Sequence, residues 1–123
     1  MAARDRRKAE ASGRRAESWV ALYLRLSGYR ILARRFRSPA GEIDIVARRG
    51  RTLVFVEVKQ RRNAAHALEP VTARAEERIV RTGETFMSRH PDYVARGFSL
   101  RFDLVVVTGR WRIDHRRDVF RGW

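Results

Sequence analysis

The sequence contains no cysteine and only three histidines. Without cysteine, disulfide bonds, zinc fingers and catalysis by a thiol are excluded. The histidines, His66, His90 and His115, are too far apart to pair on one helix turn, so no zinc-ligand set is visible, and we interpret them as surface residues. Any metal ion bound by this chain is therefore expected to have oxygen ligands.

Long hydrophobic runs are also missing. No stretch approaches the roughly 18 consecutive apolar residues of a membrane span, and the basic N-terminus has no apolar core behind it, as a secretory signal would. We therefore expect a cytoplasmic protein without a membrane partner. The chain has 123 residues, 44% of them hydrophobic, which fits a single domain over 12–123 behind a flexible basic arm over 1–11.

Acidic residues are few relative to basic ones. The chain has 28 Lys and Arg against 14 Asp and Glu, which gives a formal net charge of +14 at pH 7. This excess is far above what solubility requires, so it favours a polyanionic partner, and DNA is the first candidate. The sequence leaves open whether the chain acts as a monomer or as a homodimer.

Apolar patterns predict an α/β fold in which helices flank a mixed central sheet. The predicted elements are a helix over 12–27, strands over 29–36, 42–48 and 53–60, a helix over 72–89, and strands over 98–108 and 111–120. The second helix can serve as the crossover between parallel strands. The last strand is the least regular, so the sheet has four or five strands.

Two of these strands contain charged residues among valines and isoleucines. Because side chains alternate along a strand, Glu57 and Lys59 share one face of their strand, and Glu42 and Asp44 share one face of the preceding strand. One lysine cannot neutralise three clustered carboxylates, whereas a divalent cation can. Carboxylate oxygens suit Mg²⁺ or Mn²⁺, so we expect such an ion here.

The turn between these strands decides which acids face each other. A two-residue turn at 49–50 places Glu42 opposite Glu57, whereas a turn at 50–51 places Asp44 there. Either register gathers three carboxylates and one ammonium group in one patch. The sequence does not decide between the two.

Lys59 departs from the composition of the chain. Of the 28 cationic residues, Lys8 and Lys59 are the two lysines and the other 26 are arginines. Lysine within a strand therefore suggests a need for a compact amine, which can orient an attacking water or stabilise negative charge in a transition state. The alternative is a lysine that extends from a strand end to solvent.

Asp44, a hairpin and then Glu57-Val58-Lys59 resemble the D…(D/E)xK signature of the restriction-endonuclease-like nucleases. The chain is also similar over most of its length to the YraN family, predicted endonucleases distantly related to archaeal Holliday junction resolvases. The similar stretches are AESWVALYLRLSGYRIL, GEIDIVA, LVFVEVKQRR, the VT that opens the second helix, and RFDLVVVTG.

This resemblance implies a restriction-endonuclease-like core and metal-dependent hydrolysis of DNA that leaves 5′-phosphate and 3′-hydroxyl ends, with branched or flapped DNA as a candidate substrate. It implies that Asp44 and Glu57 bind the metal, with the backbone carbonyl of Val58 as a further ligand. Lys59 would be the catalytic lysine, and Glu17 an auxiliary acid.

Three acids keep alternative interpretations. Glu42 belongs to the GEID stretch, and whether it binds metal stays open. Glu17 is also explained by the helix dipole, which favours acids in the first turns of a helix. Asp103 lies in a buried strand with Arg101 on the same face, and we interpret these two as a structural pair.

Arginine runs flank the proposed patch in the sequence, and we expect them to bind a phosphate backbone rather than form only a solvated face. These arginines are Arg34, Arg35, Arg37, Arg48, Arg49, Arg51, Arg61 and Arg62. Trp111, Trp123 and Tyr29 can stack on unpaired bases, but aromatic residues in a small domain are more often core. The rival to a nuclease is a non-catalytic module that binds nucleic acid, and an RNA-associated basic protein is a third option.

Overall fold

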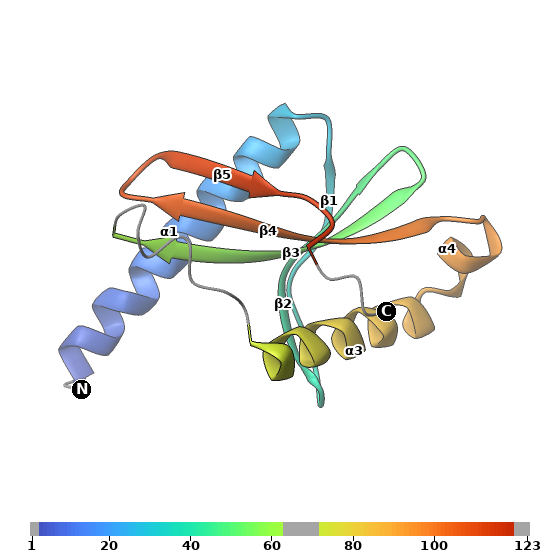
Figure 1. Cartoon of the computed structure of the whole chain (residues 1–123), viewed down its shortest axis with the longest axis horizontal. Coiled ribbons are helices and arrows are strands. Elements are labelled where there is room, and N and C mark those ends of the chain that lie inside the picture. The colour runs from blue at the N-terminus through green and yellow to red at the C-terminus, as the bar shows by residue number, and fades with distance from the viewer. Residues whose placement is uncertain (1–2, 63–71, 120–123) are drawn as a thin grey trace.

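Five strands form one mixed sheet with a helix on each face in the computed structural model of the chain. Residues 3–62 and 72–119 are described, with side chains from Gly13 onward. The elements are α1 (Ala3–Leu26), β1 (Arg30–Ser38), β2 (Gly41–Arg49), β3 (Thr52–Arg61), α3 (Ala73–Arg89), α4 (Pro91–Ala95), β4 (Ser99–Thr108) and β5 (Arg112–Arg116) (Figure 1). The predicted α/β class is confirmed, and the architecture is consistent with a restriction-endonuclease-like core.

The central strands β3 and β4 are parallel neighbours. The order in the sheet is β1-β2-β3-β4-β5, and the other three neighbouring pairs are antiparallel. Helix α3 lies in the connection from β3 to β4, as predicted for a crossover. Figure 1 shows β1 and β2 running in a different direction from β4 and β5, because neighbouring strands twist relative to one another.

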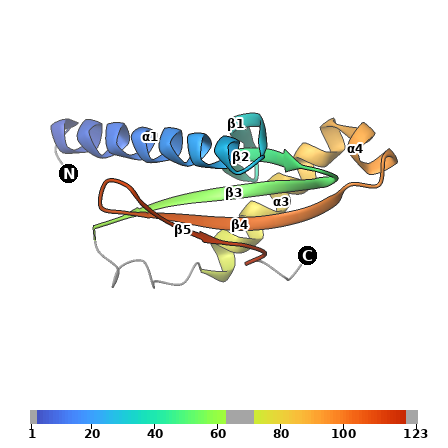
Figure 2. The same ribbon diagram turned by 90° about the horizontal axis from the view of Figure 1, so that it is seen from above.

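Buried side chains pack in two layers, one on each face of the sheet. Val54 and Val56 of β3 pack in the layer under α1, whereas Leu53 and Phe55 pack in the layer under α3. These four residues are at most 1% exposed. Figure 2 shows α1 running along one side of β3 and β4. The predicted alternation along β3 is therefore confirmed.

Helix α1 begins at Ala3 rather than at residue 12, so most of the segment expected to be a flexible arm is helical. The physical reason is composition: residues 3–12 contain no proline and are mostly Ala, Arg, Lys and Glu, which are strong helix formers. Although α1 has 24 residues, neither it nor any other helix within residues 3–62 and 72–119 is long and apolar enough to cross a membrane.

Two features near the C-terminal half differ from the sequence prediction. Pro91 ends the predicted helix but also begins the short helix α4, because proline fits the first helical position. The last strand ends at Arg116 rather than at residue 120. Asp118 has a left-handed φ of 55°, which breaks the extended conformation, and Val119 N–H donates to the Phe102 carbonyl at 2.8 Å.

The β2–β3 turn lies at 50–51. Arg49 pairs with Thr52 across the hairpin, and Gly50 has a φ of 60°, which glycine adopts without steric cost. Of the two predicted registers, the structure therefore has the one that brings Asp44 toward Glu57.

Candidate active site

Asp44 lies at the point where β2 leaves β3. The paired register runs from the hairpin turn to Ile45, which pairs with Val56. Beyond this pair, a side chain replaces a main-chain carbonyl as the hydrogen-bond acceptor: Asp44 Oδ2 accepts from Val58 N–H at 2.7 Å. Residues two apart on a regular strand face the same side, but Ile43 packs in the layer under α3 and Ile45 in the layer under α1. The alternation of side chains along β2 is therefore interrupted at Asp44.

Glu57 lies against Asp44 and is half-buried. Burial raises the pKa of Glu57 to about 9, and a hydrogen bond to Asp44 and the charge of that carboxylate add to the increase. The charge of Lys59 opposes the increase, which places its ammonium close to the same carboxyl group. At neutral pH the Glu57 carboxyl group therefore keeps its proton.

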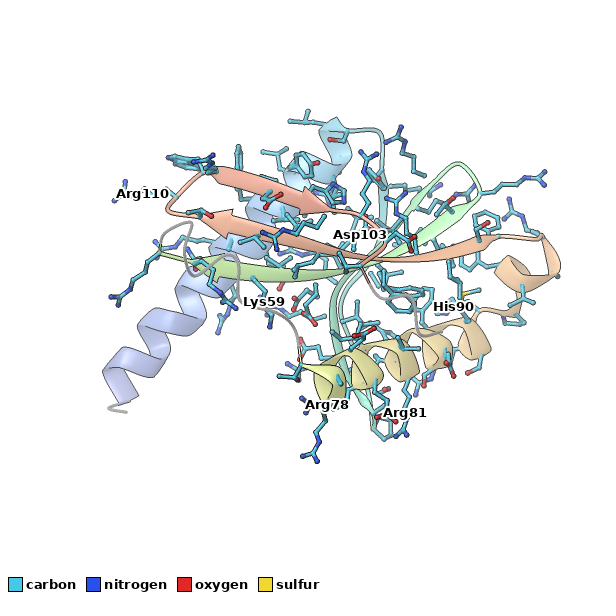
Figure 3. All side chains as sticks on the ribbon, viewed as in Figure 1. Lys59, Arg78, Arg81, His90, Asp103 and Arg110 are labelled. Atoms are coloured by element: carbon cyan, nitrogen blue, oxygen red, sulfur yellow. The ribbon has the colours of Figure 1, made fainter. Side chains whose placement is uncertain are left out.

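The backbone carbonyl of Val58 faces the same side as Asp44. Within a strand residue the N–H and the C=O project toward the same neighbouring strand, and Val58 N–H points to Asp44. The predicted third ligand is thus on the correct edge of β3. Figure 3 shows Lys59 beside β3, between α1 and the start of α3.

Glu17 of α1 is buried but is paired with arginines. Its two carboxylate oxygens accept hydrogen bonds from Arg34 Nε at 3.1 Å and Arg35 Nε at 3.3 Å. Arg35 has a left-handed φ of 53°, a strained conformation for a residue with a side chain, in a strand whose register shifts two residues earlier. Glu17 therefore holds two cations in place at the edge of the site.

A pocket of about 480 Å³ brings several predicted site residues together. Its lining comprises Gly13, Arg14, Ala16, Glu17, Arg35, Arg37, Glu42, Asp44, Val58 and Gln60. The pocket thus joins α1, β1, β2 and β3 around Asp44. Its lining carries three arginines and three acids, so positive and negative side chains meet around Asp44.

Glu42 does not join the carboxyl pair. Its side chain is exposed and forms an ion pair with Arg37 at 3.4 Å, although its charge is close enough to raise the pKa of Glu57 slightly further. Within residues 13–62 and 72–119 no three His, Asp or Glu side chains are close enough to hold a metal ion together. The expectation of three carboxylates that hold a metal together is therefore wrong, because Glu42 is paired with Arg37 although it lines the same pocket as Asp44.

The donor set still fits a magnesium-like ion. Mg²⁺ keeps several waters in proteins and typically takes one or two carboxylates together with substrate phosphate. Asp44, Glu57 and the carbonyl of Val58 supply that number of hard oxygen ligands at one place.

The structure divides the arginines that were expected to form one flanking set. Arg34, Arg35 and Arg37 lie beside the pocket, and Arg61 and Arg62 follow Lys59 at the end of β3. The others lie at the turn end of the hairpin, where Arg48 packs over Phe98 and Arg49 over Tyr29, with guanidinium carbons 4.9 Å and 5.4 Å from the ring centroids. Arg48 is four strand residues from Asp44, or about 13 Å. Arg48, Arg49 and Arg51 therefore do not flank the carboxyl pair.

A second polar cluster surrounds Asp103, which is fully buried. Arg101 donates two hydrogen bonds to its carboxylate, both at 2.9 Å, which confirms the predicted pair. His115 Nε2 lies 2.7 Å from the same carboxylate, and His115 Nδ1 lies 2.8 Å from the Tyr23 hydroxyl. Burial tends to raise the pKa of Asp103, but the hydrogen bonds from His115 and Arg101 outweigh burial, so the pKa is lowered.

The interpretation of all histidines as surface residues is wrong for His115, whose side chain is 6% exposed. It lies on β5, which pairs with β4, and faces the acid that needs a partner. His90 is exposed as expected, and His66 lies outside the described residues. The sequence signal that could have identified His115 as buried is Asp103, an acid in a buried strand next to the strand that carries this histidine.

The fold and the site define an α/β protein with a carboxyl pair and a lysine where a hairpin diverges. The chain belongs to the uncharacterised protein family UPF0102, or YraN, which it matches over residues 16–107, a segment that includes every candidate site residue. UPF0102 proteins similar to it occur in Bartonella bacilliformis (42% identical over 94% of this chain and 92% of the relative), Agrobacterium fabrum (45%, 94% and 93%) and Rhodopseudomonas palustris (48%, 90% and 85%).

The pKa of Glu57 predicts how stability depends on pH. Because this pKa is raised from 4.5 to about 9 on folding, the stabilising contribution is complete below about pH 4.5 and is lost as the pH rises toward about 9. The free energy of unfolding of the metal-free protein should therefore fall between about pH 5 and about pH 9. Glu57→Gln should reduce that fall, as measured by urea unfolding at several pH values.

Glu84→Gln, which changes an exposed acid on α3, is the matched control and should leave the pH dependence unchanged. Added Mn²⁺ should stabilise the parent more at about pH 8.5 than at about pH 5, because the ion replaces the proton of Glu57. Identical pH dependence in the parent and Glu57→Gln would contradict the pairing of the carboxyl groups.

Proposed function

We propose that this protein is a metal-dependent endonuclease that hydrolyses DNA phosphodiesters. The observation that supports this function best is the contact between the Asp44 and Glu57 carboxyl groups, with Lys59 close by, where Asp44 lines a pocket that holds both arginines and acids. The similarity of this arrangement to the D…(D/E)xK signature supports the same reaction. A cytoplasmic location also stays a prediction.

Asp44, Glu57 and the carbonyl of Val58 would hold Mg²⁺ or Mn²⁺. Bound there, the ion would supply Lewis-acid activation of the scissile phosphate and of an attacking water. The role of Asp44 begins before any ion binds, because its hydrogen bond to Val58 N–H fixes the carboxylate at the edge of β3. The site is thus positioned by backbone rather than by a mobile loop.

Lys59 provides the positive charge that the chain itself brings to the reacting group. Its ammonium group donates hydrogen bonds to a phosphate oxygen and stabilises the negative charge that develops during displacement. Lys59 and Glu57 share one face of β3, so the lysine is held at a fixed spacing from the carboxyl pair.

The arginines of the pocket position the substrate. Arg35 and Arg37 line the pocket, and Glu17 holds the guanidinium group of Arg35. Arginine binds phosphate in a fixed fork geometry, so these side chains can orient a phosphodiester toward Asp44. Glu17 acts in this account as a positioning residue, while its direct role as an auxiliary acid stays a prediction.

A non-catalytic nucleic-acid-binding module is the second candidate. Ion pairs of Glu17 and Glu42 with arginines favour it, since two of the four predicted site acids are neutralised without a metal. Both candidates require binding that weakens with salt. Only the nuclease requires the carboxyl pair and the lysine for a reaction.

Lys59→Arg separates these two candidates. Arginine keeps the positive charge, so nucleic-acid binding without metal should change little. Its guanidinium group is larger and planar and cannot take the place of a single ammonium group, so metal-dependent cleavage should fall by about a hundredfold or more. The rate is measured on plasmid, flap and four-way-junction DNA with Mg²⁺ or Mn²⁺, and cleavage at the parental rate would rule out a catalytic lysine.

Asp44→Asn tests the carboxyl pair with little change of shape. The asparagine oxygen can still accept from Val58 N–H, so the fold should survive, while the loss of charge should abolish metal-dependent cleavage. Metal-free binding of DNA should persist or become tighter, because repulsion of phosphate falls. A filter-binding assay and a cleavage assay on the same preparation check both outcomes, and retained cleavage would contradict the site.

Salt dependence should distinguish the two groups of arginines. Arg62 directly follows β3, three residues after Lys59, and Arg51 lies at the hairpin turn; both are exposed. Arg62→Gln should reduce the slope of log affinity for duplex DNA against log salt by about 0.9, the value for one lost phosphate contact. Arg51→Gln should leave the slope nearly unchanged. Equal effects of the two variants would show that binding does not centre on the pocket.

A further inference from the structure

Trp111, between β4 and β5, is 67% exposed, so its interpretation as a core residue is wrong. Tyr29 is core, with 4% of its surface exposed, and Trp123 lies outside the described residues. The Trp111 ring meets the Trp19 ring of α1 edge to face, with centroids 5.3 Å apart and an interplanar angle of 79°. Trp19 Nε1 also donates to the Trp111 carbonyl at 3.0 Å, which ties the turn to the helix.

This tryptophan pair leaves aromatic surface available for a ligand. In an edge-to-face pair one ring contributes its edge and the other a single face, so the contact itself covers one of the four ring faces. The hydrogen bond from Trp19 fixes the geometry of the pair. The site is therefore ordered before any ligand binds, which lowers the entropy cost of binding.

Two hollows border the pair. One, of about 430 Å³, is lined by Arg15, Ala16, Trp19, Gln60, Arg110 and Trp111. The other, of about 440 Å³, is lined by Arg14, Arg15, Ser18, Trp19, Leu22 and Trp111. In the part of the chain that the structure describes, no carboxylate forms an ion pair with Arg15 or Arg110. Figure 3 shows Arg110 at the turn between β4 and β5.

These hollows border the pocket that contains Asp44. Ala16 and Gln60 line both that pocket and the first hollow, and Arg14 lines both that pocket and the second. A chain with its phosphate at Asp44 can therefore continue along α1 toward Trp111. Cations accompany the whole path, as a phosphate backbone requires.

We propose that Trp111 and Trp19 form a stacking site for unpaired bases of the strand whose phosphate occupies the Asp44 pocket. This inference rests on the proposed function, and it identifies the substrate class as nucleic acid with a single-stranded segment. Bases in a duplex have their faces covered by neighbouring pairs, so only an unpaired base can stack on an indole. Arg15 and Arg110 contact the flanking phosphates.

A second copy of the chain fits this surface less well. Arginines border the exposed aromatic and apolar side chains, and the whole chain has a formal charge of +14. Two copies would bring these like charges together, whereas a single-stranded nucleic acid supplies both aromatic faces and negative charge.

The test measures binding of the full chain without metal to a single-stranded oligonucleotide and to a duplex of equal length. Trp111→Ala should weaken single-strand binding by about tenfold, within the range for loss of one stacked base, and should change duplex binding by less than about twofold. Trp111→Phe should retain most of the affinity. Leu26→Ala is the control: it removes an exposed apolar side chain at the end of α1 and should change neither single-strand binding nor duplex binding.

Tryptophan fluorescence of the parent and of Trp111→Ala provides a second measurement. Stacking of a base on Trp111 should quench the fluorescence when the single strand is added, and Trp111→Ala should lose most of that quenching. The proposal would be overturned by absence of quenching or by equal loss of single-strand and duplex binding. It would also be overturned if Trp111→Ala sedimented as a smaller species than the parent, because the surface would then be a contact between copies of the chain. Because no metal is present, stacking can be confirmed even if the protein cleaves nothing, so failure of the proposed function is a separate result.

Discussion

The hydrogen bond from Val58 N–H to the Asp44 carboxylate is the interaction on which the candidate site depends. It forms where β2 can no longer follow β3, so a side chain satisfies a main-chain donor that the ladder leaves unpaired. The same bond fixes Asp44 at the edge of β3, against Glu57. A feature that completes the sheet thus also builds the site.

Groups that favour a cation and groups that favour an anion lie close together in the candidate site. Burial and the neighbouring Asp44 raise the pKa of Glu57, which makes a positive ion favourable there, while Arg34, Arg35 and Arg37 pair with the acids Glu17 and Glu42. A phosphate is attracted by the arginines and is repelled by the carboxyl pair unless a cation lies between them. This combination is expected of a site that brings phosphate and metal together, and the adjacent tryptophan pair would add recognition of an unpaired base.

Much of the fold could be predicted from local patterns. Alternation of residues 53–56 defines the two faces of β3, and the helical spacing in α3 predicts the crossover, because both depend on neighbouring residues. The start of α1 was predicted too late, since charge suggested a solvated arm while helix propensity decided the conformation. The register remained open because a two-residue turn fits equally well at 49–50 or 50–51.

The site could be predicted only where it lies on one hairpin. Asp44, Glu57 and Lys59 follow from the period of a strand, whereas the ion pair of Glu42 with Arg37 depends on how β1 bends. His115 depends on the pairing of β4 with β5, which brings it to an acid 12 residues away in the sequence. Exposure of Trp111 depends on its place in a turn. These features require long-range contacts that no local pattern contains.

The central claim is that this chain hydrolyses phosphodiesters, and analysis of reaction ends tests it most directly. The unmodified protein is incubated with branched DNA that has single-stranded segments, with and without Mg²⁺ or Mn²⁺, and the products are tested for religation and for labelling of their 5′ ends. The account predicts cleavage only with metal, leaving 5′-phosphate and 3′-hydroxyl ends that a ligase can rejoin. Intact DNA under all these conditions, or cleavage without metal, would contradict it.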